Sequence, residues 1–176
     1  YEGLSLLHNT QLGDWDSTVQ VMYGSFDGEI NAITEKTQAE LNDFAGINWT
    51  LAYDWFSVRA AYLVAETSFA LDGTDPSGAA LNGLEAALRA NSLNTLADDI
   101  AINEDDSYFF GFGFSIDYDN FLFDAEYTQF EVENSILTEQ TQYYASVGYR
   151  LDDVIVHFTY EDNDDKHDAS RFDPIA

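Results

Sequence analysis

The sequence of 176 residues contains no cysteine, two prolines and six basic residues. Without cysteine, neither a disulfide nor a cysteine-ligated metal site can form. Six lysines and arginines cannot build the basic stripe that a phosphate backbone requires, so we expect no nucleic-acid partner. No run of 18 apolar residues is present, so we expect no transmembrane helix. The sequence begins at Tyr1 with no signal peptide, which predicts a mature form, a fragment or the ordered part of something longer.

Two features of the composition are rarely found together. The 33 acidic residues give a formal net charge of −27, while aromatic residues make up 15% of the sequence. Chains this acidic are usually disordered and poor in aromatic residues. Abundant rings among alternating apolar residues instead predict a folded chain, and the length suits a single domain over residues 1–176.

Apolar residues alternate with small or polar ones in many segments, and this period of two predicts β-strands. The clearest segments are 18–24, 47–53, 56–62, 110–116, 121–127, 143–149 and 154–160, and residues 3–11 form a weaker eighth. We expect strands of roughly 10 residues, and roughly 9–11 residues let a tilted strand cross a bilayer.

The connections alternate in length. Short turns are expected at 12–15, 54–55, 118–120 and 151–153, with longer loops at about 25–42, 67–106 and 132–139 and an acidic tail from Glu161. Within 67–106, Ala79 to Asn91 is predicted to form a short helix that Ser77 could cap. Short turns on one side and long loops on the other are typical of an antiparallel transmembrane β-barrel.

The alternation divides the side chains between two faces. Aromatic residues of the apolar face gather near both strand ends, as in the girdles at the two membrane interfaces. The girdle residues are Trp15, Tyr23, Tyr53, Trp55, Tyr62, Tyr118, Phe121, Tyr127, Tyr149 and Tyr160. The charged residues of the opposite, pore-lining face are Arg59, Asp117, Asp124, Glu126, Arg150, His157 and Glu161. A soluble, calycin-like ligand-binding barrel with its apolar face inward fits the alternation alone.

The alternation, the girdles and the turn asymmetry resemble Gram-negative outer-membrane porins, and most closely the acidic porins of marine gamma-proteobacteria. The segments Leu12-Gly-Asp-Trp-Asp16, Ser146-Val-Gly-Tyr-Arg150 and Val156-His-Phe-Thr-Tyr160 carry the likeness. The resemblance implies an integral protein of the bacterial outer membrane, in contact with lipid and lipopolysaccharide. It also implies passive diffusion of small hydrophilic solutes and cations and no enzymatic activity. A homotrimer is one possible oligomeric state.

Two departures bear on the strand count. Porins end on a strand with a terminal Phe or Trp, whereas residues 172–176 suggest a loop, and porins have about 16 to 18 strands against the eight counted here. An eight-stranded barrel is only wide enough inside for side chains, and buried charges there must be paired. The pore-lining set has more carboxylates than cations, so we expect part of a 16-stranded porin. A small eight-stranded outer-membrane barrel with a structural or adhesive role remains the alternative.

The expected mechanism is selection by charge. Carboxylates on the wall and in the long loop would favour cations over anions. The acidic residues of that loop, as a constriction or a cap, are Asp98, Asp99, Glu104, Asp105 and Asp106. Asp124 and Glu126 share a strand face. We expect them to contribute negative potential to the pore wall rather than to act in general acid–base catalysis. No cofactor is expected, although weak Ca²⁺ or Mg²⁺ binding at Asp162, Asp164 and Asp165 is conceivable, without the glycine and terminal glutamate of an EF-hand loop.

Overall fold

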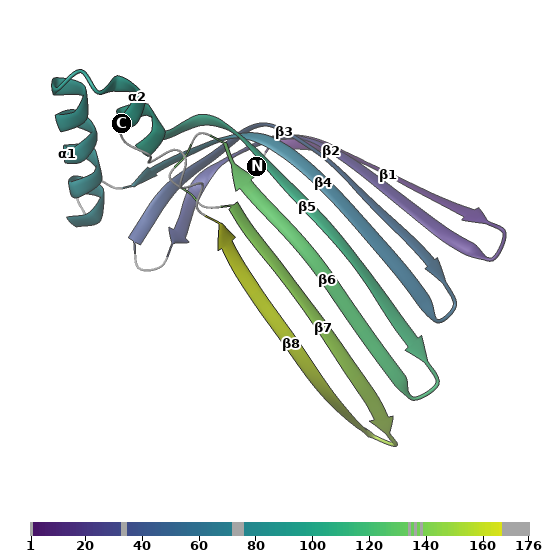
Figure 1. The fold of residues 1–176 in the computed structure, drawn as a ribbon. Helices are drawn as coiled ribbons and strands as arrows, with labels where there is room; N and C mark the ends of the chain where they lie inside the picture. Colours follow the sequence, from purple (N-terminus) through teal and green to yellow (C-terminus); the bar gives the residue numbers. More distant parts are fainter. Residues whose placement is uncertain are drawn as a thin grey trace, which may run out of the picture.

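The computed structural model describes residues 2–32, 35–71, 76–133, 135, 137 and 139–166. These residues form eight antiparallel strands in one sheet, which follow each other in sequence order, and two helices (Figure 1). The strands are β1 (Glu2–Leu12), β2 (Trp15–Ala32), β3 (Glu35–Tyr53), β4 (Phe56–Leu71), β5 (Ile102–Tyr118), β6 (Phe121–Val132), β7 (Glu139–Leu151) and β8 (Val154–Lys166). The helices are α1 (Pro76–Ala90) and α2 (Asn94–Ile100). The predicted all-β antiparallel class is therefore confirmed.

The four short turns are confirmed, and each joins its two strands through two residues. The first residue of each turn has a positive φ: 68° at Gly13, 39° at Asp54, 53° at Asp119 and 49° at Asp152. Glycine adopts this left-handed conformation without steric cost, and aspartate tolerates it better than most residues. The turn chemistry thus fixes where four of the strand pairs reverse.

The longer connections are shorter than the sequence predicted, because the strands continue into them. Pairing of β2 with β3 runs up to Ala32 and Glu35, so 25–42 is mostly a hairpin rather than a loop. Glu104, Asp105 and Asp106 belong to β5, which leaves 72–101 as the connection after β4. Glu161 continues β8 to Lys166 instead of opening a tail. Period-two patterning stops being visible where both faces are polar, although the backbone pairing goes on. Residues 167–176, with the predicted terminal loop, lie outside the described residues.

The sheet is a single layer with very little hydrophobic core. Among the described residues the buried apolar side chains are Ala39, Ala97, Ile100 and Val132. The sheet is also open, since β1 and β8 are its edges and do not pair with each other within the part described. A soluble domain normally buries an apolar sheet face against a second layer, and that layer is missing among these residues.

The helices lie beyond the strand ends opposite the short turns (Figure 1). The expected helix over 79–91 is confirmed with different bounds, Pro76 to Ala90, so Ser77 lies inside its first turn and the prediction that it caps the helix is wrong. α1 packs mainly against α2, and Arg89 of α1 bonds both Glu85, at 2.9 Å, and Asp98 of α2, at 2.8 Å. The hydrogen bond to Glu85, followed by that to Asp98, raises the pKa of the Arg89 guanidinium. Within the described chain, neither helix is long and apolar enough to cross a membrane.

Candidate functional site: the polar face of the sheet

The strand register places the predicted pore-lining residues on one side of the sheet, called here the polar face. Antiparallel partners point to the same side, so a row of partners across the sheet can be followed from strand to strand. One such row contains Arg59 of β4, Gly113 of β5, Glu126 of β6, Tyr144 of β7 and Glu161 of β8. The sequence predicted the faces of these strands correctly, while the row itself depends on the register.

An ion pair crosses this row between two strands that are not neighbours. Arg59 Nη2 lies 3.0 Å from Glu126 Oε2, although β5 runs between their strands. Gly113, opposite both residues in the register, has no side chain to block the guanidinium. A Cβ at Gly113 would lie 3.3 Å from the carbonyl oxygen of Ala125 and 3.7 Å from Glu126 Cβ. The glycine therefore leaves the space in which arginine bridges two strands.

A second ion pair lies near the short turns. Arg150 donates to both carboxylate oxygens of Asp117, at 2.5 Å from Nη1 and 2.7 Å from Nη2, and also to the carbonyl oxygen of Asp119 at 3.2 Å. Bidentate pairing of this kind fixes the guanidinium plane. Both basic residues of the polar face named by the sequence are thus held by carboxylates.

The remaining charged residues of this face have no cationic partner among the described residues. Asp124 accepts a hydrogen bond from Ser115 Oγ at 2.7 Å, and Glu161 stands exposed on β8. His157 lies on the same face at the edge of the sheet, opposite Gly148. Among the predicted residues of this face, four carboxylates stand against two guanidiniums. The register adds Asp16 of β2 and Asp165 of β8 to the same face, so carboxylates in excess set a negative potential over it.

The opposite side, called here the apolar face, exposes large hydrophobic side chains. Phe112 is 45% exposed, Val147 42% and Phe158 70%. Near the short turns the predicted girdle residues contact one another: the ring centroids of Trp15 and Tyr53 are 4.9 Å apart, and those of Trp55 and Tyr118 5.7 Å. The girdle residues toward the other end are exposed along the same face; they are Tyr23, Tyr62, Tyr127 and Tyr160. The two faces therefore differ sharply in chemistry.

Tyrosines on the apolar face donate hydrogen bonds to carboxylates at the strand ends where the apolar residues give way to polar ones. Sequence reasoning missed this feature. Tyr23 donates to Asp43 at 2.7 Å. Tyr143 donates to Asp162 at 2.8 Å. Both phenols lie at the end of the apolar rows away from the short turns. Strand alternation alone cannot find these pairs, since each partner is on a different strand and its position depends on register or on a bulge.

The acidic residues singled out in the loop and the tail are not brought together. Asp98 pairs with Arg89, away from the polar face, while Glu104 and Asp106 are part of β5. Asp162 and Asp164 lie on one side of β8, and Asp165 lies on the other side. Within the described residues, no group of three histidine, aspartate or glutamate side chains is placed to hold a metal ion.

Comparison of the chain with protein-family models, curated proteins and solved structures finds no match. The functional interpretation therefore depends on the two faces and on the charges of the polar one.

Proposed function

We propose that the eight-stranded sheet forms part of the wall of a porin-type β-barrel of about 16 strands in a bacterial outer membrane. The polar face lines a water-filled channel, and the apolar face contacts lipid and the acyl chains of lipopolysaccharide. The channel admits small hydrophilic solutes and ions by passive diffusion and prefers cations.

The observation that carries this proposal is the single-layer sheet with one exposed apolar face. Contiguous apolar patches on soluble monomers rarely exceed a few hundred Å². Here Val21, Ile47, Tyr62, Phe110 and Phe112 are all at least 36% exposed on adjoining strands. Lipid would cover such a face, and a hydrophilic lumen suits the charged residues opposite.

Trp49 adds a detail that supports a lipid-facing role for the apolar face. Its indole Nε1–H donates to Ser17 Oγ at 3.0 Å, and the Ser17 side chain is buried beneath it. Every polar group in a hydrocarbon environment needs an internal partner. This pair satisfies the one donor of the indole within the face.

Planar-bilayer recording tests the proposal directly. Purified protein in detergent is expected to insert and give stepwise conductance, with a reversal potential under a KCl gradient that shows cation preference. A clear anion preference would contradict the charge assignment, and stable solubility without detergent would favour the soluble binding barrel instead. The small structural barrel predicts insertion with little or no conductance.

A further inference from the structure

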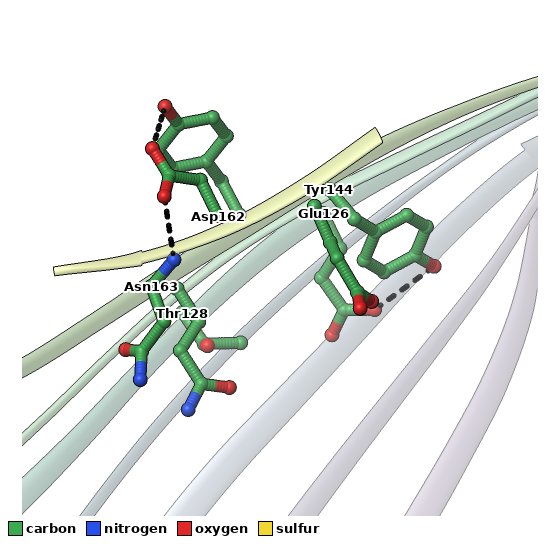
Figure 2. A pocket seen from close by; sticks show the side chains of 8 residues that line it. Glu126, Thr128, Tyr144, Asp162 and Asn163 are labelled. Atoms are coloured by element: carbon green, nitrogen blue, oxygen red, sulfur yellow. Dashed lines mark hydrogen bonds between the residues drawn. The ribbon is translucent and has the colours of Figure 1, made fainter. Parts of the chain in front are cut away.

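The polar face is hollowed where β6, β7 and β8 run together, beside the Arg59–Glu126 pair. The residues of this β6–β8 hollow on the polar face are Glu126, Thr128, Gln142, Tyr144, Glu161 and Asn163. Figure 2 shows Glu126, Thr128, Tyr144 and Asn163 on one side of the sheet, while Asp162, which borders the same space, lies on the other side. The hollow is therefore built by three strands. Most of its lining lies on the polar face, and it reaches the edge strand β8, where Tyr143 and Asp162 of the other side also border it.

The register arranges these side chains in two adjacent rows. Glu126, Tyr144 and Glu161 are partners in one row, and Thr128, Gln142 and Asn163 are partners in the next. Neighbouring strands lie about 4.8 Å apart and the two rows about 7 Å, which is comparable to the size of one sugar ring. Six polar or aromatic groups thus surround an area suited to a small ring.

Tyr144 supplies the aromatic ring of this set, on a face whose strands also carry Phe109 and Phe130 farther from the short turns. Its side chain is 36% exposed, and its hydroxyl donates to Glu126 Oε2 at 3.4 Å. The contact directs the ring toward β6 beside the hollow (Figure 2). Tyrosine offers a flat apolar surface with a polar tip.

The surrounding polar groups have unused hydrogen-bonding capacity. The side chains of Thr128 and Gln142, and the Glu161 carboxylate, have no hydrogen bond or ion pair with any described residue. A primary amide both donates and accepts, a hydroxyl does the same, and a carboxylate only accepts. A sugar has hydroxyls that donate and accept around its rim and an apolar face of C–H groups that packs on an aromatic ring.

We propose that the β6–β8 hollow is a transient binding station for uncharged, hydroxyl-rich solutes, namely short oligosaccharides, on the wall of the channel. This inference rests on the proposed function and names a solute class for it. A neutral ligand fits better than an organic cation, since Arg59 already neutralises Glu126 and four of the six groups are uncharged. Binding must stay weak, because a solute that passes through a channel has to leave each site again.

Ion-current recording with maltotriose is the test. We expect maltotriose to reduce the current through the open channel with saturation, whereas polyethylene glycol of similar size reduces it without saturation. Tyr144→Leu is expected to raise the half-saturating concentration about tenfold, because the ring surface is lost. Tyr144→Phe keeps the ring and should change it little. Tyr127→Leu, which removes a ring from the apolar face of β6, is the matched control and should leave saturation unchanged.

The outcomes separate this inference from the proposed function. Calorimetric titration of detergent-solubilised protein with maltotriose measures binding without a channel. If maltotriose binds saturably, Tyr144→Leu abolishes the binding and the protein shows no conductance, the result would support the binding site in the hollow and contradict the channel. Conductance without saturation, or saturation that Tyr144→Leu leaves intact, would overturn the hollow alone. Saturable block by spermidine and not by maltotriose would show that the hollow takes organic cations, which also refutes the oligosaccharide assignment.

Discussion

Removing either charge of the Arg59–Glu126 pair should shift ion selectivity, and the two single variants should shift it in opposite directions. The pair has no net charge, and Arg59 Nη2 lies 3.0 Å from Glu126 Oε2 in the space above Gly113. Glu126→Gln leaves Arg59 uncompensated and adds one positive charge to the wall, so cation preference should fall. Arg59→Gln frees the Glu126 carboxylate, so cation preference should rise. The double variant restores neutrality and should match the parent.

The size of the shift follows from Coulomb's law. A unit charge about 8 Å from a passing ion contributes about 0.5 kcal/mol in water, and screening at 0.1 M salt reduces this to about 0.2 kcal/mol. Because the potential acts with opposite sign on K⁺ and Cl⁻, their permeability ratio should change about twofold for each single variant. The pair itself should contribute no more than about 1 kcal/mol to stability, since Arg59 is 54% exposed.

Reversal potentials across a planar bilayer under a KCl gradient measure this ratio. Asp43→Asn is the control, because it removes a carboxylate from the apolar side, where Asp43 accepts from Tyr23. It should move the potential much less than either single variant. Single variants that shift the potential in the same direction, or an effect of Asp43→Asn as large as theirs, would refute the assignment of the polar face to the lumen.

Four further variants probe the faces, the turns and the helices. Phe112→Lys, on the apolar face, should lower the free energy of unfolding in lipid by about 2–4 kcal/mol in urea titrations, whereas Thr128→Lys, on the polar face, should be nearly neutral. Gly13→Ala should cost about 1 kcal/mol in the same titration, because φ at this turn is 68°; an unchanged midpoint would contradict the turn assignment. Arg89→Gln should speed amide hydrogen exchange in α1 and α2 and leave the strands unchanged, since its partners lie within the helical pair; faster exchange in β4 would show that the helices support the sheet.

Local pattern was sufficient for the half of each strand next to the short turns and for its two faces, because a period of two dictates which side each residue takes; it missed the extensions of the strands into the predicted loops. Arg59, Glu126 and Arg150 were placed correctly on the polar face for this reason. The two-residue turns were also predictable, as glycine and aspartate favour the left-handed backbone found there. These are properties of neighbouring residues in one strand or one turn.

Contacts between strands were not predictable in the same way. The bridge from Arg59 to Glu126 needs the register of three strands and the missing side chain of Gly113. Tyr144 was overlooked because two consecutive tyrosines, 143 and 144, lie on opposite faces, and the first fits the apolar pattern. A tyrosine out of phase with the apolar period is the signal that would have found the hollow.

The proposed channel places a requirement on the two edges of the sheet. An unpaired backbone N–H or C=O in hydrocarbon costs several kcal/mol, so β1 and β8 must both pair with further strands in the membrane. Eight alternating strands leave β1 and β8 antiparallel to each other. Any strands that close the barrel with antiparallel pairing throughout must therefore be even in number. Eight more would give the proposed 16 and a water-filled lumen, in which Asp124 and Glu161 can stay charged without a cationic partner.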